Sequence, residues 1–152
     1  MTKKRVLFVS SAGGHLSQLL QLRPWWAGHD RRWVTFDLAD ARSKLIGEEV
    51  IPAYYPTTRN LFNAARNLWL ARTVLREWRP DVIISNGAGV AVPFFIFGKL
   101  LGITTVYLEV YDRIDSRTLT GRLVRPFTTT FCVQWPEQQK INPNSVLVGP
   151  LY

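Results

Sequence analysis

The residues with the clearest chemical potential lie in a glycine-rich turn near the start of the chain. Gly13 and Gly14 follow the apolar run Arg5–Ser10, and His15 comes directly after them. Residues without side chains at a strand-to-helix turn let a phosphate approach backbone N–H groups and the positive end of the helix. That helix end also favours the neutral imidazole that a general base needs. The pattern predicts a diphosphate site beside a proton acceptor, although a glycine pair alone also suits a simple tight turn.

A second glycine-rich turn strengthens the functional interpretation. Asn86, Gly87 and Gly89 follow the apolar run 82–85 and precede another apolar stretch. Two such turns after two parallel strands would lie side by side at one edge of a sheet. Neither turn matches the dinucleotide-binding fingerprint or the phosphate loop of ATPases. The sequence therefore argues against a dehydrogenase and against a P-loop ATPase.

Glu109 ends a third apolar run, and Arg113 follows four residues later. A carboxylate at the end of a central strand is costly to desolvate unless it is paired. Glu109 is therefore either paired with Arg113 or held for chemistry, and the two roles are compatible. Thr118 or Thr120 is expected to cap the helix that follows. His29 has no partner pattern and is expected at the surface.

The segment 61–78 predicts an amphipathic helix with a basic, aromatic face. Its expected sheet-facing stripe consists of Ala64, Leu68, Ala71, Leu75 and Trp78. Beside that stripe lie cationic and aromatic side chains, as an interfacial membrane helix presents them: Phe62, Trp69, Arg72, Arg76 and Arg79. A solvated face with snorkelling arginines is the alternative interpretation. Nucleic acid is not expected as a partner because no nucleic-acid-binding motif accompanies the charge.

Composition places these features in one soluble-type domain. The chain has 152 residues and a formal net charge of +8, which suits phosphate groups or anionic lipid surfaces. Cys132 is the only cysteine and lies in an apolar run, which predicts a small buried side chain and excludes an internal disulfide. The apolar stretch 87–101 contains Pro93 and Gly98 and is too short for a membrane-spanning helix. No secretory signal is expected.

Apolar runs bounded by turn residues alternate with helical patterns along the whole chain. Strands are expected at 6–10, 33–38, 50–54, 82–85, 105–109, 129–134 and 146–148, and helices at 16–25, 39–46, 61–78, 90–101 and 119–124. The strands lack strict alternation, as is typical when helices cover both faces of a parallel sheet. The expected fold class is α/β, a Rossmann-like doubly wound parallel sheet, with ligands beyond the carboxyl ends of its strands.

The ordered set of motifs resembles one family over nearly the whole chain. The motifs are Ser11–Leu16, Arg79–Gly89, Gly98–Gly102, Glu109 with Arg113, Leu119–Gly121, Val133–Trp135 and Val148–Pro150. They resemble the acceptor-side, membrane-recruiting subunit of two-component GT-B glycosyltransferases. That family includes a subunit of the eukaryotic UDP-N-acetylglucosamine transferase of the dolichol pathway, and bacterial capsule and exopolysaccharide counterparts.

The resemblance implies that residues 1–152 form a single acceptor-side domain, equivalent to the amino-terminal half of a GT-B glycosyltransferase. A separate donor-binding protein would supply the UDP-sugar site, and the acceptor would be a saccharide on polyprenyl diphosphate. His15 and Glu109 would be catalytic, without a metal or another cofactor and with inversion at the anomeric carbon. Gln134 and Trp135 would lie at the partner interface. The acceptor diphosphate would face Gly13, Gly14, Asn86, Gly87, Gly89 and Arg113.

Two departures from the family pattern refine this expectation. Eukaryotic members carry an amino-terminal membrane helix that this sequence does not show, so a bacterial protein in the cytoplasm, held peripherally at the inner face of the plasma membrane, is the better fit. The residues 110–112 and 117–118 also differ from those of many members, which leaves the transferred sugar open. A membrane-recruiting scaffold that contributes no catalytic group is the alternative function.

Overall fold

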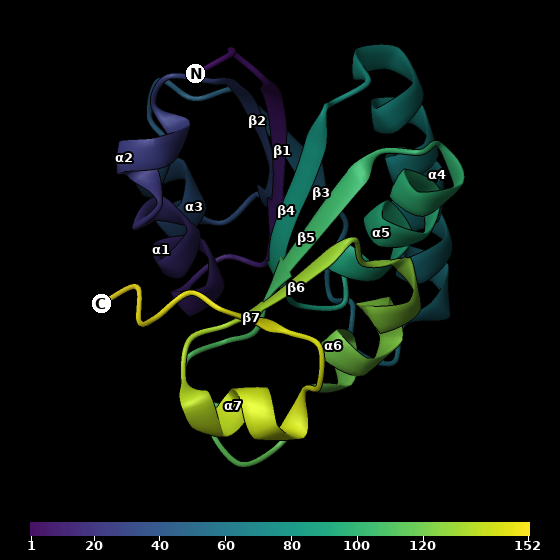
Figure 1. Ribbon diagram of the computed structural model, residues 1–152. Coiled ribbons are helices and arrows are strands. Elements are labelled where there is room, and N and C mark those ends of the chain that lie inside the picture. The colour runs from purple at the N-terminus through teal and green to yellow at the C-terminus, as the bar shows by residue number, and fades with distance from the viewer.

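The computed structural model describes residues 1–152 and contains one seven-stranded sheet, in which every strand is parallel to its neighbours (Figure 1). The strand order is β3-β2-β1-β4-β5-β6-β7. The strands are β1 Arg5–Ser10, β2 Asp30–Phe36, β3 Val50–Ala53, β4 Val82–Gly87, β5 Thr104–Leu108, β6 Thr130–Val133 and β7 Val146–Leu147. The helices are α1 Gly14–Leu20, α2 Arg23–Trp26, α3 Ala39–Lys44, α4 Leu61–Trp78, α5 Ala91–Leu100, α6 Leu119–Val124 and α7 Pro136–Ile141. The expected Rossmann-like sheet is confirmed.

Helices cover both faces of the sheet and so bury most of its central strands. Figure 1 shows α1, α2 and α3 on one face and α4, α5 and α6 on the other. In β1, Val6 and Phe8 belong to the apolar core beside α1 and α2, whereas Leu7 and Val9 belong to the core beside α4 and α5. All four side chains have no exposed surface. This two-sided burial explains why the strands read as continuous apolar runs.

The structure differs from the expected elements mainly between residues 14 and 36. The helix expected over 16–25 is two helices, because α1 ends at Leu20 and α2 restarts with Pro24 in its first turn. Proline lacks the N–H that a continuing helix would need and fits a first turn instead. The strand expected from Trp33 begins earlier, at Asp30. The helix α7, with Pro136 at its start, was not expected at all.

His29 is the clearest correction to a single residue. It was expected at the surface, yet its side chain is buried. Its Nδ1 accepts a hydrogen bond from the backbone N–H of Lys4 at 3.2 Å, and its ring packs edge-on against Trp25. His29 therefore joins the amino-terminal segment to the start of β2. Cys132 is buried in β6, as expected.

The buried face of α4 also differs from the expected apolar stripe. Leu68 is 41% exposed, whereas Asn63 and Asn67 are buried. The Asn67 amide accepts from the backbone N–H of Tyr54 and donates to its carbonyl, both at 2.9 Å. These bonds satisfy the backbone that follows β3, so polar side chains take positions that apolar periodicity would not assign to the core. No helix combines the length and the apolar character needed to cross a membrane.

Candidate functional site

The candidate site lies where the strand order reverses. Strand β1 is followed in the sheet by β2 on one side and by β4 on the other, so the connections leave β1 and β4 in opposite directions. Parallel sheets of this kind bind ligands beyond the carboxyl ends of the strands at this point. A crevice of about 290 Å³ lies there, lined by Gly14, His15, Gln18, Val110, Tyr111, Asp112, Arg113 and Thr118. The turns after β1 and β5 thus meet in one cavity.

His15 is held in a defined orientation and tautomer. Its Nδ1 lies 3.0 Å from the carbonyl oxygen of Asn86. Since a carbonyl only accepts hydrogen bonds, Nδ1 carries the proton and Nε2 is left as the basic nitrogen. Burial lowers the pKa of His15, and the hydrogen bond to Asn86 and the negative charge of Asp112 oppose that shift in part. The imidazole is therefore neutral near pH 7, as a general base requires.

Asn86 supports His15 rather than the crevice. Its side chain is fully buried, and its Nδ2 donates to the backbone carbonyl of His15 at 2.8 Å. Together with the hydrogen bond from the His15 ring, this hydrogen bond links the end of β4 to the start of α1. Asn86 was expected to face a diphosphate, but its side chain has no exposed surface and does not line the crevice.

The two turns differ in how strictly the fold requires glycine at each position. Gly87 has φ +112°, and a Cβ there would lie 3.1 Å from His15 Cε1, so both the backbone and the imidazole require glycine. Gly13 has φ +77°, which also favours glycine. A Cβ on Gly14 would meet nothing within 4 Å, and its φ is ordinary. The fold does not need glycine at position 14, which lines the crevice.

Two backbone donors expected to face a diphosphate are already used inside the chain. The N–H of Gly13 donates to Asp40 Oδ2 at 2.7 Å, and that of Gly87 donates to Ser85 Oγ at 3.1 Å. Asp40 is in turn paired with Lys44 at 2.7 Å. The expectation for the N–H groups of Gly13 and Gly87 is therefore corrected. The exposed positions among the expected diphosphate-binding residues are Gly14, Gly89 and Arg113.

Glu109 does not line the crevice and forms no ion pair with Arg113. Its fully buried carboxyl accepts hydrogen bonds from Thr118 Oγ1 at 3.0 and 3.2 Å and from the Val110 N–H at 3.1 Å. Burial raises the pKa of Glu109, against the effect of these bonds and of Arg113. The expected direct catalytic contact is corrected, because the carboxyl reaches the crevice only through Thr118 and Val110, which line it. Glu109 is a positioning residue in this geometry.

The start of α6 closes around Glu109. Thr118 accepts a hydrogen bond from the Gly121 N–H at 3.0 Å, which confirms it as the helix cap. A Cβ on Gly121 would lie 2.7 Å from Glu109 Oε2 and 2.8 Å from Thr118 Oγ1, so only glycine fits without a shift. The Tyr107 hydroxyl lies 3.4 Å from Thr118 Oγ1, and burial raises the pKa of Tyr107. Thr118 is a crevice residue that sequence reasoning treated only as a cap.

Gln134 and Trp135 have separate roles in this chain. Gln134 is 1% exposed, and its Nε2 donates to Gln18 Oε1 at 3.0 Å and to the Glu109 carbonyl at 3.1 Å. Its Oε1 accepts from the Leu151 N–H at 3.1 Å, which ties down the carboxyl-terminal segment. Gln134 is therefore an internal cross-link with no surface for a partner. Trp135 is half-buried, and its Nε1 donates to the Tyr111 carbonyl at 2.7 Å.

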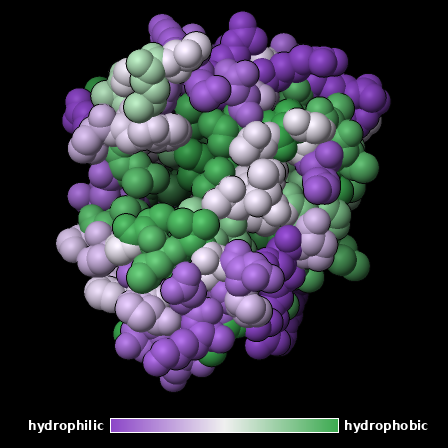
Figure 2. All heavy atoms as spheres, in the orientation of Figure 1, coloured by the Kyte–Doolittle hydropathy of each residue, from purple (hydrophilic) through white to green (hydrophobic).

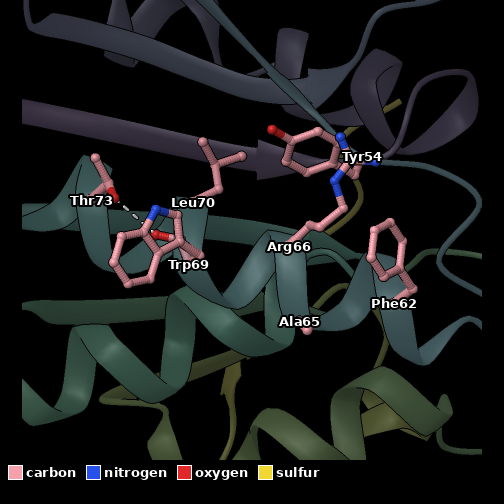
Figure 3. A pocket seen from close by; sticks show the side chains of 7 residues that line it. All are labelled: Tyr54, Phe62, Ala65, Arg66, Trp69, Leu70 and Thr73. Carbon is pink, nitrogen blue, oxygen red and sulfur yellow. Dashed lines mark hydrogen bonds between the residues drawn. The ribbon is translucent and has the colours of Figure 1, made fainter.

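A second cavity, of about 580 Å³, lies on the outer face of α4 (Figure 3). Phe62 and Trp69 line it and are 72% and 67% exposed. The Arg66 guanidinium lies 3.7 Å from the ring centre of Tyr54, between that ring and Phe62 (Figure 3). Arg72 lies 5.3 Å from the Trp69 ring, and Arg76 and Arg79 are exposed. Sequence reasoning missed Tyr54, and it counted Arg66 among the basic residues of this helix without assigning it to the membrane face, although Arg66 follows Phe62 by one helical turn.

Solved structures place the fold in a class. The crystal structure of Acinetobacter baumannii MurG matches 88% of this chain with a TM-score of 0.71 and 17% identity. A Staphylococcus aureus MnaA–UDP structure matches 97% with a TM-score of 0.76 and 8% identity. The chain spans less than half of either protein, 42% and 45% respectively. The fold is thus the Rossmann-like α/β domain found in GT-B glycosyltransferases such as MurG.

Sequence comparison then gives the family. Residues 27–151 match the model for "Oligosaccharide biosynthesis protein Alg14 like", and the chain belongs to this family. The mouse UDP-N-acetylglucosamine transferase subunit ALG14 is 27% identical over 95% of this chain and 82% of its own length. The Schizosaccharomyces pombe subunit is 29% identical over 89% of this chain and 77% of its own length. A Geobacillus thermodenitrificans pyrophosphoryl-undecaprenol N-acetylglucosamine transferase is 29% identical over 58% of this chain and 24% of its own length.

Proposed function

We propose that this chain is the acceptor-side subunit of a two-component inverting glycosyltransferase. With a separate donor-binding protein, it transfers a sugar from a UDP-sugar to a saccharide on polyprenyl diphosphate, in capsule or exopolysaccharide biosynthesis. Two kinds of support meet here: membership of a family whose relatives are named UDP-N-acetylglucosamine transferase subunits, and the GT-B type of fold.

The observation that carries the proposal is His15 at the switch point of the sheet. Its Nδ1 is committed to the Asn86 carbonyl, so its Nε2 is free to accept the proton of an acceptor hydroxyl. The hydroxyl oxygen then attacks the anomeric carbon of the donor, and the bond from that carbon to the UDP oxygen breaks. UDP leaves with the bonding electron pair, and attack from the opposite side inverts the anomeric centre. Arg113 and the exposed Gly14 lie in the same crevice and suit the acceptor diphosphate.

The outer face of α4 supports peripheral binding at the cytoplasmic face of the plasma membrane. Phe62 and Trp69 offer exposed aromatic surface, while Arg72, Arg76 and Arg79 supply positive charge beside it. Aromatic side chains with adjacent cations are the features by which interfacial helices bind anionic lipid surfaces. A lipid-linked acceptor would remain in the membrane while its saccharide reached the crevice.

The carboxyl-terminal edge of the sheet supports a protein partner. Val146, Leu147 and Val148 are 49%, 42% and 49% exposed. In Figure 2 hydrophobic side chains gather beside the carboxyl-terminal segment, at the edge formed by β7. An exposed apolar edge strand is unfavourable in water and favourable in an interface. We place the donor-binding protein against this edge and against Trp135. This residue lies in the connection between β6, the neighbour of β7 in the sheet, and α7.

Reconstitution tests the proposal directly. The chain is co-expressed with a candidate donor-binding protein, and the purified complex is assayed with a UDP-sugar and a polyprenyl-diphosphate-linked saccharide. Transfer is expected from the complex and from neither protein alone. Transfer by this chain alone, or tight binding of a UDP-sugar by it alone, would contradict the divided site.

A membrane-recruiting scaffold without a catalytic group is the second candidate, because the cavity on the α4 face, at about 580 Å³, is larger than the crevice, at about 290 Å³. Replacement of His15 by Ala separates the two functions. Loss of transfer with an intact complex and intact membrane binding supports catalysis by His15. Unchanged transfer leaves the scaffold as the function of this chain.

A further inference from the structure

Three arginines line a polar pocket that the proposed reaction does not use. The pocket has a volume of about 300 Å³ and lies between α6 and the loop after α7. Its lining consists of Arg117, Arg122, Arg125, Asn142 and Gly121 with two prolines. It shares no residue with the crevice at His15. In Figure 2 hydrophilic side chains cover the lower part of the molecule, where α6 and α7 lie.

The three guanidinium groups have no carboxylate partner. No ion pair within 4.0 Å involves any of them. Arg117 donates to the carbonyl of Ile141 and Arg125 to that of Pro143, so main-chain oxygens orient both side chains without neutralising them. Burial and the nearby charge of Arg117 lower the pKa of Arg125. The fold therefore maintains like charges close together, at a cost in free energy that a bound anion would offset.

Arg125 is positioned from two sides and still has an unused donor. Its guanidinium lies 4.2 Å from the ring centre of Phe131, which stacks against its face. Its Nη1 is buried and has no hydrogen-bond partner. Stacking on Phe131 and the hydrogen bond to the Pro143 carbonyl fix the orientation of this guanidinium, so its charge stays at the pocket.

We propose that this three-arginine pocket binds a phosphoryl group. Guanidinium forks match the spacing of phosphate oxygens and form paired charge-assisted hydrogen bonds with them. The charge of the three arginines suits a phosphate better than a single carboxylate, and two prolines are the only apolar side chains of the lining. The phosphoryl group belongs either to a soluble phosphate ester or to a phospholipid headgroup. The pocket is next to the crevice, because Gly121 lines it and also packs against Glu109 and Thr118.

Titration calorimetry on the full chain at low ionic strength tests this site. The soluble probes are inorganic phosphate, pyrophosphate and a short-chain phosphatidic acid below its micelle concentration. Arg122→Gln is the preferred variant because Arg122 is exposed and has no side-chain hydrogen bond within the chain, so its loss leaves the fold intact. Arg23→Gln is the matched control, since Arg23 is exposed on α2 across the sheet and its loss lowers the net charge equally.

Arg122→Gln is expected to weaken phosphoryl binding about tenfold, and Arg23→Gln to leave it unchanged. Comparable binding of pyrophosphate and the short-chain lipid assigns the site to phosphate esters in general. Binding of the lipid and of phosphatidic acid vesicles, without binding of the inorganic probes, assigns it to a headgroup. Equal losses in the two variants, or no binding of any phosphoryl probe, would overturn the proposal. None of these outcomes depends on glycosyl transfer, so the site stands or falls separately from the proposed function.

Discussion

Residues 1–49 and residues 50–152 differ in whether their charged side chains form ion pairs with one another. The paired region, residues 1–49, contains five acidic residues, and each forms an ion pair with a lysine or arginine of the same region. The unpaired region, residues 50–152, contains six acidic and eleven basic residues and has no ion pair. The net charge of +8 alone does not show this difference between the two regions.

The difference separates structural charges from charges left for other molecules. In the paired region Arg31 and Glu48 hold β2 to the segment before β3. Guanidinium groups stack on aromatic rings in both regions, but in the unpaired region, as with Arg66 on Tyr54 and Arg125 on Phe131, they do so without a carboxylate partner. A stacked guanidinium keeps its edge donors for an anion. Both the α4 face and the three-arginine pocket lie in this region, and so does Glu109, which is buried without a cation.

The largest expected effect concerns membrane binding by the unpaired region. Simultaneous Arg72→Glu, Arg76→Glu and Arg79→Glu substitutions remove about 1 kcal/mol of attraction per arginine, and the new charges repel anionic lipid. Binding to vesicles with anionic lipid is expected to fall more than about 100-fold, measured by flotation at low salt. Wild-type binding is expected to weaken in high salt as well, because salt screens exposed charges.

A matched charge reversal in the paired region controls for net charge. Lys3→Glu, Lys4→Glu and Arg23→Glu also lower the net charge by six, and all three side chains are exposed. This triple variant is expected to retain most of the vesicle binding. Equal losses in the two triple variants would show that overall charge, rather than the α4 face, governs the interaction.

The next effect is on stability, from a pair in the paired region. Glu48 accepts from Arg31 at 2.6 and 2.8 Å and from Trp33 Nε1 at 3.0 Å, and both side chains of the pair are mostly buried. Glu48→Ala leaves these donors unsatisfied, so the free energy of unfolding is expected to fall by about 2–3 kcal/mol in urea titration. Glu77→Ala on α4, where no ion pair is lost, is expected to change it by less than about 0.5 kcal/mol. A similar loss in both variants would refute the division into two regions.

A smaller effect is expected where the unpaired region buries a carboxyl. Gly121→Ala places a methyl group within 3 Å of Glu109 and Thr118, and such overpacking costs about 1–3 kcal/mol. In an exposed helix the same substitution would stabilise, so the sign of the change reports the contact. Transfer by the reconstituted complex is also expected to fall, because Thr118 lines the crevice. Gly28→Ala, with open space around it, is the control. Stabilisation by Gly121→Ala would contradict this packing.

The sequence predicted the sheet well because burial on both faces leaves a strong local signal. Each expected strand exists, and the turns at Gly13 and Gly87 lie where ligand-binding turns of this fold occur. Element boundaries were less predictable, since Pro24 interrupts a stretch whose apolar spacing alone favours one helix. The burial of His29 could not be read from its polar neighbours, because its partner is the backbone of Lys4.

The candidate site was predictable in position but not in its hydrogen bonds. Residue type and order placed His15 and Glu109 after the carboxyl ends of two strands of the same sheet, β1 and β5. The sequence could not show that Asp40 occupies the Gly13 N–H, or that Thr118 stands between Glu109 and the crevice. These contacts join residues 27 and 9 positions apart through loops, for which periodicity gives no information. The three-arginine pocket likewise combines residues from α6 and from the loop after α7, a helix that the sequence did not indicate.

The smallest effect is on the pH dependence of transfer. Burial holds the pKa of His15 below its ordinary value of 6.5, so the basic form predominates at pH 7 and transfer is expected to fall only as the pH drops below 6.5. Asp112 has no cation partner, and its charge raises the pKa of His15 in part. Asp112→Asn is therefore expected to move the acidic limb of kcat/KM to lower pH, with little change above pH 7.

Stability provides an independent check on the same group. The folded protein binds the His15 proton less readily than the unfolded chain does, so the unfolded state gains protons first as the pH falls through 6.5. The free energy of unfolding is expected to decrease in that window, and His15→Gln is expected to remove that part of the decrease. If Asp112→Asn shifts the acidic limb to higher pH, or leaves it in place, the field of this unpaired carboxylate does not act on His15. Burial and the hydrogen bond to Asn86 would then determine the pKa of His15 without a contribution from Asp112.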